Sequence, residues 1–300
     1  MPVGPLYPLA RKLIPDNGLT PLRAGTTRYR YFIYHQWPQQ VDKLRISRFM
    51  KNPKTEILYG IHSVHEALKA GRRHFFALYV TKDKASKRLS KVVEAAEILN
   101  VPVKRVNAAQ LDLVTGTDHH QGIGAVVSPY FLAGISDIVG RAESASADCF
   151  LLLLDNVIDP HNLGALVRTA LCVGIDGIVI PKDRSALPTP TVSKASAGAL
   201  EHASLVRVTN MVNTIKVLKQ KGLWIAGLDI VANRSIYSSD LAGSIAIVIG
   251  GEEKGIRPLV KKQCDILMSI PQNSRINSLN ASVAGAVVMY EAFRQRSLRK

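Results

Sequence analysis

The sequence predicts an α/β fold built around a parallel sheet, and three observations lead to this prediction. Residues Phe150–Leu154 form an apolar run without alternation, which is typical of a strand buried on both faces. The polar turn residues of Asp155–Asn162 follow, and then an apolar stripe at helical spacing that begins at Leu163 and ends at Leu171. Gly177–Ile180 begins the next strand. Strand, turn, helix and strand in this order form a βαβ unit, whose crossover makes neighbouring strands parallel.

The composition points to a nucleic-acid partner. The 300 residues allow one large domain or two ordinary ones, and an apolar content of 47% is ample for packed cores. A formal net charge of +16 favours a polyanionic partner, nucleic acid first, over a generically basic surface. No apolar run approaches the ~20 residues that a membrane helix needs. Cys149, Cys172 and Cys264 fit neither a disulfide framework nor a zinc pattern, which favours a reducing compartment.

The N-terminal residues differ from the rest of the chain. Residues 1–49 hold six prolines and eight basic residues against two acids, with no sustained period. No apolar segment follows the early charges, which disfavours a secretory signal. Three alternatives stay open: a leader ahead of a true start at Met50, a mitochondrial transit peptide, and an RNA contact through Tyr29–Tyr34. A leader ahead of a start at Met50 is favoured, and we expect residues 1–54 to be a flexible leader or extension.

Residues 55–130 alternate between helical and strand patterns, which predicts a small α/β domain. The expected elements are a helix from Ile61 that ends at Gly71, strands at Phe75–Val80, Val101–Val106 and Ile123–Val127, and helices at Leu89–Leu99 and Ala108–Thr115. A basic run is either a solvated helix entry or a surface that faces RNA; it comprises Lys82, Lys84, Lys87, Arg88 and Lys91. His119 and His120 have no further ligand at suitable spacing, so no metal site is expected.

Residues 131–148 show little periodicity and are expected to be a linker, and residues 149–300 form the second domain. After the first βαβ unit we expect helices at Ser193–Glu201, Met211–Lys221 and Leu279–Arg294, and strands at Leu205–Val208, Trp224–Leu228, Ile245–Ile249 and Ile266–Ile270. The glycine-rich loop Gly250–Gly255 ends a buried strand without a Walker A pattern. Glycines there allow a ligand to approach the backbone.

Candidate functional residues gather after the first buried strand, because ligands of α/β sheets bind where strand carboxyl ends meet helix amino ends. These residues are Asn156, Asp159, His161, Asn162 and Arg168. Three separated segments then match one family in order and spacing. The segments are Asp159–Gly164 with Arg168–Ala170, Ile249–Glu252 with Gly255, and Ile270–Pro271 with Ser278–Ala284. With these segments the chain resembles the SpoU/TrmH-type RNA ribose 2′-O-methyltransferases, from about Glu56 to Arg296.

The resemblance implies a fold and partners. The second domain would be a SPOUT α/β-knot methyltransferase domain, in which a trefoil knot binds S-adenosylmethionine. The first domain, with Tyr59–Ile61 and His120–Ile123, is similar to the L30e-like RNA-binding domain of the RlmB-type subgroup. That subgroup methylates a guanosine ribose of bacterial large-subunit (23S-type) rRNA and has mitochondrial counterparts. The family acts as homodimers, with the site near the dimer interface.

The resemblance also implies an activity, which is methyl transfer from S-adenosylmethionine to a ribose 2′-hydroxyl in rRNA without a metal. Leu228, Gly250, Ile270 and Leu279 would hold the methyl donor, and catalysis and substrate placement would fall to Asn162, Arg168, Glu252, Ser278 and Asn280. A ribose hydroxyl is a poor nucleophile until its proton is withdrawn or its developing charge is stabilised. Arg168 suits charge stabilisation, because a guanidinium normally stays protonated. Glu252 would pair with Arg168 or order its own loop.

The departures from the family pattern concern donor affinity. Glu253 stands where many members have glycine, and Gln272 and Ser274 replace the commoner methionine and glycine. The alternatives to rRNA methylation are tRNA ribose methylation and a non-catalytic RNA-binding or ribosome-assembly factor. A start at Met50 would imply the bacterial cytoplasm, whereas a cleaved leader would imply the mitochondrial matrix.

Overall fold

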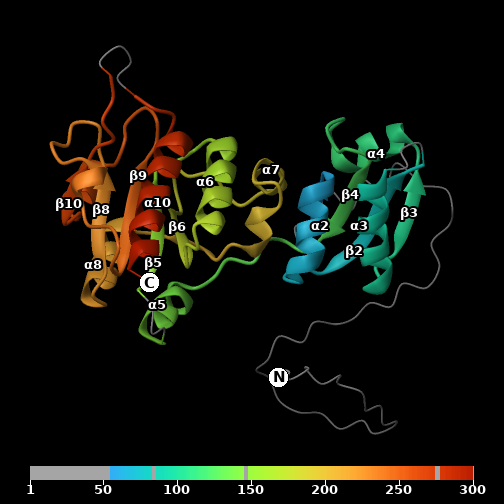
Figure 1. Cartoon of the computed structure of the whole chain (residues 1–300). Helices are drawn as coiled ribbons and strands as arrows, with labels where there is room; N and C mark the ends of the chain where they lie inside the picture. The colour runs from blue at the N-terminus through green and yellow to red at the C-terminus, as the bar shows by residue number, and fades with distance from the viewer. Residues whose placement is uncertain (1–54, 83–85, 145–147, 274–277, 300) are drawn as a thin grey trace, which may run out of the picture. The chain divides into compact units, whose positions relative to one another are not determined.

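The computed structural model describes residues 55–82, 86–144, 148–273 and 278–299, and these residues build two β-sheets (Figure 1). One sheet has four strands in the order β1-β4-β2-β3, and the other has six in the order β10-β8-β9-β5-β6-β7. The predicted leader, the proposed start at Met50 and Tyr29–Tyr34 lie outside the described residues. Among the helices of the described chain, none is both long enough and apolar enough for a membrane span.

The four-stranded sheet is mixed. Strands β1 and β4 pair antiparallel, as do β2 and β4, whereas β2 and β3 pair parallel. Its elements are β1 (Glu56–Tyr59), α2 (Ile61–Ala70), β2 (Phe75–Thr81), α3 (Lys87–Ile98), β3 (Val103–Val106), α4 (Ala108–Thr115) and β4 (Ile123–Val127). Gly71 ends α2 in the left-handed conformation, and Asn107 begins α4 with a reciprocal capping box to Gln110. The short strand β1 has no counterpart among the sequence predictions.

The six-stranded sheet is parallel throughout, as the sequence predicts. Its strands are β5 (Phe150–Asp155), β6 (Gly177–Pro181), β7 (Leu205–Val208), β8 (Trp224–Leu228), β9 (Ile245–Gly250) and β10 (Ile266–Met268). Every residue of β5 is buried. The alternation of side chains across a strand explains why an unbroken apolar run fits here: Phe150, Leu152 and Leu154 enter one core, and Leu151 and Leu153 enter the other.

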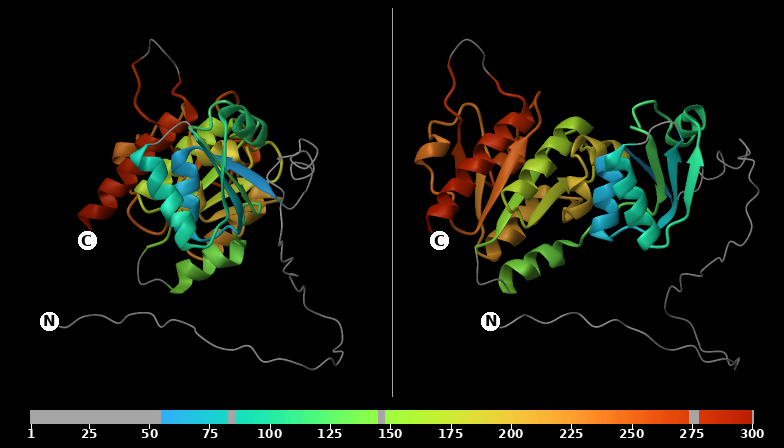
Figure 2. Two further views of the ribbon diagram at one scale, coloured as in Figure 1. Left: turned by 90° about the vertical axis from the view of Figure 1, so that its right-hand side faces the viewer. Right: turned by 45° about the vertical axis from the view of Figure 1, so that its right-hand side comes forward.

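Helices cover both faces of this sheet. The helices α6 (Pro160–Cys172) and α10 (Ala281–Leu298) pack side by side on one face (Figure 2). The opposite core takes side chains from α5 (Ile135–Ser144), α8 (Met211–Gln220) and α9 (Pro258–Lys261). Two short 3₁₀ helices and α7 complete the described elements: η1 (Ala199–His202), η2 (Ile236–Ser238) and α7 (Pro190–Ala195).

Three sequence predictions need correction. The expected linker 131–148 contains α5, and the side chains of Ile138 and Val139 on this helix are buried. The small residues around them obscure the helical period in the sequence. The expected helix at Ser193–Glu201 is broken into α7 and η1, because Ala197 and Gly198 adopt positive φ angles of 53° and 86°. The last helix starts at Ala281 rather than at Leu279, because Asn280 occupies the cap position before it.

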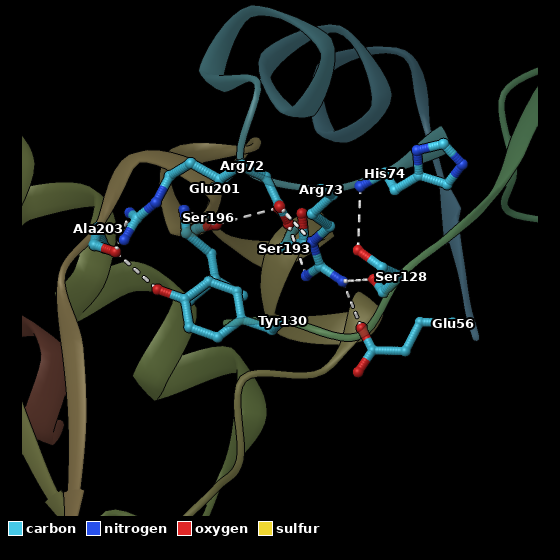
Figure 3. A network of polar contacts seen from close by, with 11 residues as sticks. Glu56, Arg72, Arg73, His74, Ser128, Tyr130, Ser193, Ser196, Glu201 and Ala203 are labelled. Atoms are coloured by element: carbon cyan, nitrogen blue, oxygen red, sulfur yellow. Dashed lines mark hydrogen bonds and ion pairs between the residues drawn. The ribbon is translucent and has the colours of Figure 1, made fainter. Parts of the chain in front are cut away.

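A buried arginine joins the elements of the two sheets (Figure 3). Arg73 Nε lies 2.6 Å from Glu201 Oε2, and Arg73 Nη1 lies 2.5 Å from Glu56 Oε2 and donates to the Ser128 carbonyl at 3.1 Å. The guanidinium also lies 5.4 Å from the ring centroid of Tyr130. Burial alone would lower the pKa of Arg73, but the charges and hydrogen bonds of Glu201 and Glu56 outweigh it and raise that pKa. Arg73 is therefore held as a cation in the interior.

Replacement of Glu201 tests this buried pair. We expect Glu201→Ala to lower the free energy of unfolding by about 3 kcal/mol, because it leaves a buried guanidinium short of its main partner. Glu66→Ala is the matched control: Glu66 pairs with Lys69 and His202 nearer the surface, and its loss should cost less than about 1 kcal/mol. Chemical denaturation with both variants is the measurement. Equal losses would contradict the interpretation.

Candidate functional site

The carboxyl ends of β5, β8 and β9 open onto two cavities that share one wall. We call them the Asn156 cavity, of about 420 Å³, and the Leu228 cavity, of about 330 Å³. The residues common to both are Gly251, Glu252, Glu253, Lys254 and Ala281. The shared wall is therefore mostly the glycine-rich loop that follows β9, at the edge of the sheet where the sequence predicts a ligand site.

Two predicted site residues from distant segments bond to Glu252 of this wall and to each other, and we call the three the polar triad: Asn162, Glu252 and Asn280. Asn162 Nδ2 donates to Glu252 Oε1 at 3.0 Å, and Asn280 Nδ2 donates to Asn162 Oδ1 at 2.9 Å. Asn280 Nδ2 also donates to Glu252 Oε1. Each member bonds to both of the others, so the three side chains fix one another's orientation.

Helix starts explain how the two asparagines reach Glu252. Asp159 caps α6 by accepting from the backbone N–H groups of His161 and Asn162 at 3.0 and 3.3 Å, and Pro160 occupies the first turn. Asn280 caps α10: its Oδ1 accepts from the N–H groups of Ser282 and Val283 at 2.9 and 3.3 Å. Asn280 therefore begins its helix with Oδ1 and joins the polar triad with Nδ2.

A buried carboxylate holds the loop in place. Asp155, fully buried at the end of β5, accepts from Arg257 N and Arg257 Nε, both at 2.8 Å, and Arg257 Nη2 lies 2.6 Å away. The Asp155 carbonyl accepts from Gly251 N at 2.9 Å. Sequence reasoning missed Asp155 and Arg257 as a pair. The available signal was an acid that ends an otherwise wholly apolar strand.

The loop approaches its neighbours too closely for side chains. A Cβ on Gly250 would lie 2.0 Å from the carbonyl carbon of Gly255, and one on Gly251 would lie 2.1 Å from the carbonyl oxygen of Asn156. Gly255 adopts a left-handed φ of 58° and donates its N–H to the Gly251 carbonyl at 2.9 Å. The glycines are thus required by close backbone packing as well as by any ligand.

The four residues expected to hold a methyl donor all line the Leu228 cavity: Leu228, Gly250, Ile270 and Leu279. Ser278 and Glu252 line the same cavity, so the structure brings together residues from the ends of β8, β9 and β10 and from the start of α10. Glu253 and Gln272, which depart from the family pattern, also line it. Ser274 lies outside the described residues.

Arg168 stands apart from the rest of the candidate site. It lies on α6 six residues after Asn162, which is about 9 Å along the axis and about 240° around it. The side chain is exposed and lines neither cavity. Glu252 bonds to the two asparagines, so its expected pairing with Arg168 is not found in the described chain. His161 is likewise exposed and lines neither cavity.

The described residues contain no group of three or more histidine, cysteine, aspartate or glutamate side chains that could hold a metal ion. His120 instead makes hydrogen bonds within its own domain: Nε2 lies 2.8 Å from Asp112 Oδ1, and Nδ1 accepts from Gly122 N at 2.9 Å.

Replacement of Gly250 tests the tight packing of the shared wall. We expect Gly250→Ala to lower the free energy of unfolding by about 1–3 kcal/mol, because the new methyl group would overlap the backbone of Gly255. Gly243→Ala is the matched control, since a Cβ there meets no atom within 4 Å. Chemical denaturation measures both variants. If Gly250→Ala is as stable as the control, the loop does not pack as described.

Comparison with known proteins assigns the family. Residues 149–290 match the SpoU rRNA Methylase family, and residues 57–133 match the family described as RNA 2′-O ribose methyltransferase substrate binding. The crystal structure of the SpoU methyltransferase AviRb from Streptomyces viridochromogenes, in complex with AdoMet, superposes with a TM-score of 0.71 at 20% identity. The superposition covers 86% of this chain and 100% of that one, which confirms the predicted fold class.

Curated relatives match at higher identity. The 23S rRNA (guanosine-2′-O-)-methyltransferase RlmB of Photorhabdus laumondii is 39% identical over 246 residues, which cover 81% of this chain and 99% of the relative. The enzyme of the same name from Escherichia coli strain K12 is 38% identical, with 81% and 100% covered. With both domains matched and the relatives covered almost end to end, this chain belongs to the SpoU rRNA methylase family.

Proposed function

We propose that this protein transfers the methyl group of S-adenosylmethionine to the 2′-hydroxyl of a guanosine ribose in large-subunit rRNA. Family membership supports the reaction class, and the two RlmB relatives support the substrate. Two observations support RNA as the partner. The first domain matches an RNA substrate-binding family, and the chain carries a net charge of +16. The observation that carries the proposal is the polar triad, whose Glu252 lines the Leu228 cavity.

The Leu228 cavity fits the methyl donor by its chemistry. Leu228, Ile270 and Leu279 offer apolar surface to a nucleoside, and the close backbone at Gly250 offers hydrogen-bonding groups without a side chain in the way. Asp229 and Lys261, which form an ion pair, add charged groups for the polar ends of the donor. S-adenosylmethionine bound there supplies an activated methyl group.

The polar triad orients the acceptor. In the proposed transfer the ribose oxygen would take the methyl group, the donor would leave as the neutral thioether, and the hydroxyl proton would pass to the carboxylate of Glu252. Asn162 and Asn280 hold the carboxylate of Glu252 at the shared wall, where its oxygens can accept from a ribose hydroxyl. Ser278, at the same cavity, adds a hydroxyl that can donate or accept.

A second copy of the chain completes the site in this proposal. Arg168 is exposed and lies away from the polar triad of its own chain, so a homodimer can deliver it to the partner's site, where it stabilises developing negative charge. Apolar side chains on α10 are exposed as well and suit such an interface: Val283, Tyr290 and Phe293. The trefoil knot implied by the family resemblance also stays a proposal.

The compartment proposed is the cytoplasm, because the relatives named above come from bacteria. A location in the mitochondrial matrix depends on residues 1–49, which lie outside the described residues.

Methyl transfer from labelled S-adenosylmethionine to purified large-subunit rRNA, with bulk tRNA in parallel, tests the proposed reaction. We expect label in one guanosine ribose of the rRNA, mapped by nuclease digestion and mass spectrometry. Asn162→Ala should lower the rate at least about 100-fold, because Glu252 and Asn280 both lose a hydrogen-bond partner that orients them. Label in tRNA alone would move the substrate to tRNA. Donor binding without transfer would favour a non-catalytic RNA-binding factor.

Mixed dimers test the proposed role of Arg168. Arg168→Ala and Asn162→Ala subunits should each be inactive alone. After unfolding and refolding of an equal mixture, we expect about a quarter of the wild-type activity, because half of the dimers then carry one intact site. A mixture as inactive as its components would place Arg168 in its own chain's site, and an active Arg168→Ala protein would place it outside catalysis. Sedimentation of the wild-type protein as a monomer would contradict the proposed homodimer.

A further inference from the structure

The Asn156 cavity combines two uncommon backbone conformations. Asn156 and Arg184, which both line it, adopt left-handed φ angles of 65° and 57°. For a residue other than glycine this region is sparsely populated, and such residues concentrate at binding and catalytic sites. The described chain has five non-glycine residues of this kind, and two of them lie at this one cavity. Arginine is a less usual occupant of this conformation than asparagine.

Two cationic side chains at the Asn156 cavity are available to bind a ligand. Arg184 and Lys254 line the cavity with exposed side chains, and the structure gives neither of them an ion pair or hydrogen bond with another described residue. Two of the acids there are already engaged: Asp159 caps α6, and Glu252 belongs to the polar triad. The third acid, Glu253, lies on the shared wall.

An amide at the cavity also lacks a partner. The Oδ1 atom of Asn156 is buried without a hydrogen bond from the described residues, although amide oxygens in protein interiors are normally paired. Asn156 lies directly after Asp155 at the end of β5, where its carbonyl packs against Gly251. Asn156 therefore packs directly against the shared wall at Gly251.

We propose that the Asn156 cavity receives the target nucleotide and that Arg184 binds the phosphate next to the methylated ribose. This inference rests on the proposed function and names the acceptor side of that site. A volume of about 420 Å³ lies in the usual range for ligand pockets. The position is suitable, because the polar triad residues Asn162 and Glu252 line this cavity while Glu252 also faces the Leu228 cavity. Arginine provides a forked donor that matches phosphate geometry.

The test compares Arg184→Gln and Arg184→Lys with Lys182→Gln. Lys182 is an exposed cation in the same loop and does not line the cavity, so it controls for a general loss of positive charge. RNA affinity is measured by fluorescence anisotropy over a range of salt concentrations, and KM values for RNA and S-adenosylmethionine are measured separately.

For Arg184→Gln we expect about a tenfold weaker affinity for a fragment of the target rRNA. The slope of log K against log salt should become shallower by about 0.7–0.9, the value for one lost phosphate contact. Arg184→Lys should keep the wild-type slope, and KM for S-adenosylmethionine should stay unchanged in both variants. Lys182→Gln should bind RNA as the wild type does.

Three results would overturn the inference. The first is a wild-type salt slope and affinity in Arg184→Gln, and the second is an equal loss of RNA affinity in Lys182→Gln. The third is a loss of S-adenosylmethionine affinity in Arg184→Gln, which would assign Arg184 to the donor side. Because RNA binding is measured without catalysis, these outcomes differ from failure of the proposed function, in which the wild-type enzyme itself transfers no methyl group to RNA.

Discussion

The candidate site depends on one buried carboxylate. Asp155 ends the central strand β5, and a charge without solvent would be costly if it were not fully paired. Its partner Arg257 follows the glycine-rich loop, 102 residues further along the chain. The carboxylate accepts from the backbone and side chain of Arg257, while the carbonyl of Asp155 accepts from Gly251. Both ends of the loop are therefore tied to the sheet, and with them the wall that divides the two cavities.

Much of the fold was predictable because its signals are local. The apolar run of β5 and the turn after it depend on a few consecutive residues, and the bounds of β7 and β8 match the predicted strands. The residues of the polar triad were predicted in a different way, from three segments whose order and spacing resemble those of a known family. Composition alone indicated a basic nucleic-acid-binding protein and no particular chemistry.

The remaining features depend on tertiary context. The helix α5 is rich in small and polar residues, and only its packing against the six-stranded sheet reveals its apolar face. The break before η1 requires a positive φ at Ala197, and alanine in a sequence does not indicate such a conformation. The pair Arg73 and Glu201 joins residues 128 positions apart. Arg168 is exposed because the opposite face of α6 packs on the sheet. The sequence motif alone does not indicate which face that is.

The shared loop makes the two cavities thermodynamically dependent on each other. Residues Gly251 to Lys254 form part of the surface of both, so a molecule that changes the position of the loop from one side alters the shape of the other side. Linkage then requires reciprocity: whatever factor the first molecule applies to the affinity of the second, the second applies to the first. With donor and acceptor in these cavities, as proposed, their cooperative or ordered assembly would require a shift of this short turn of backbone alone, without movement of any helix or strand.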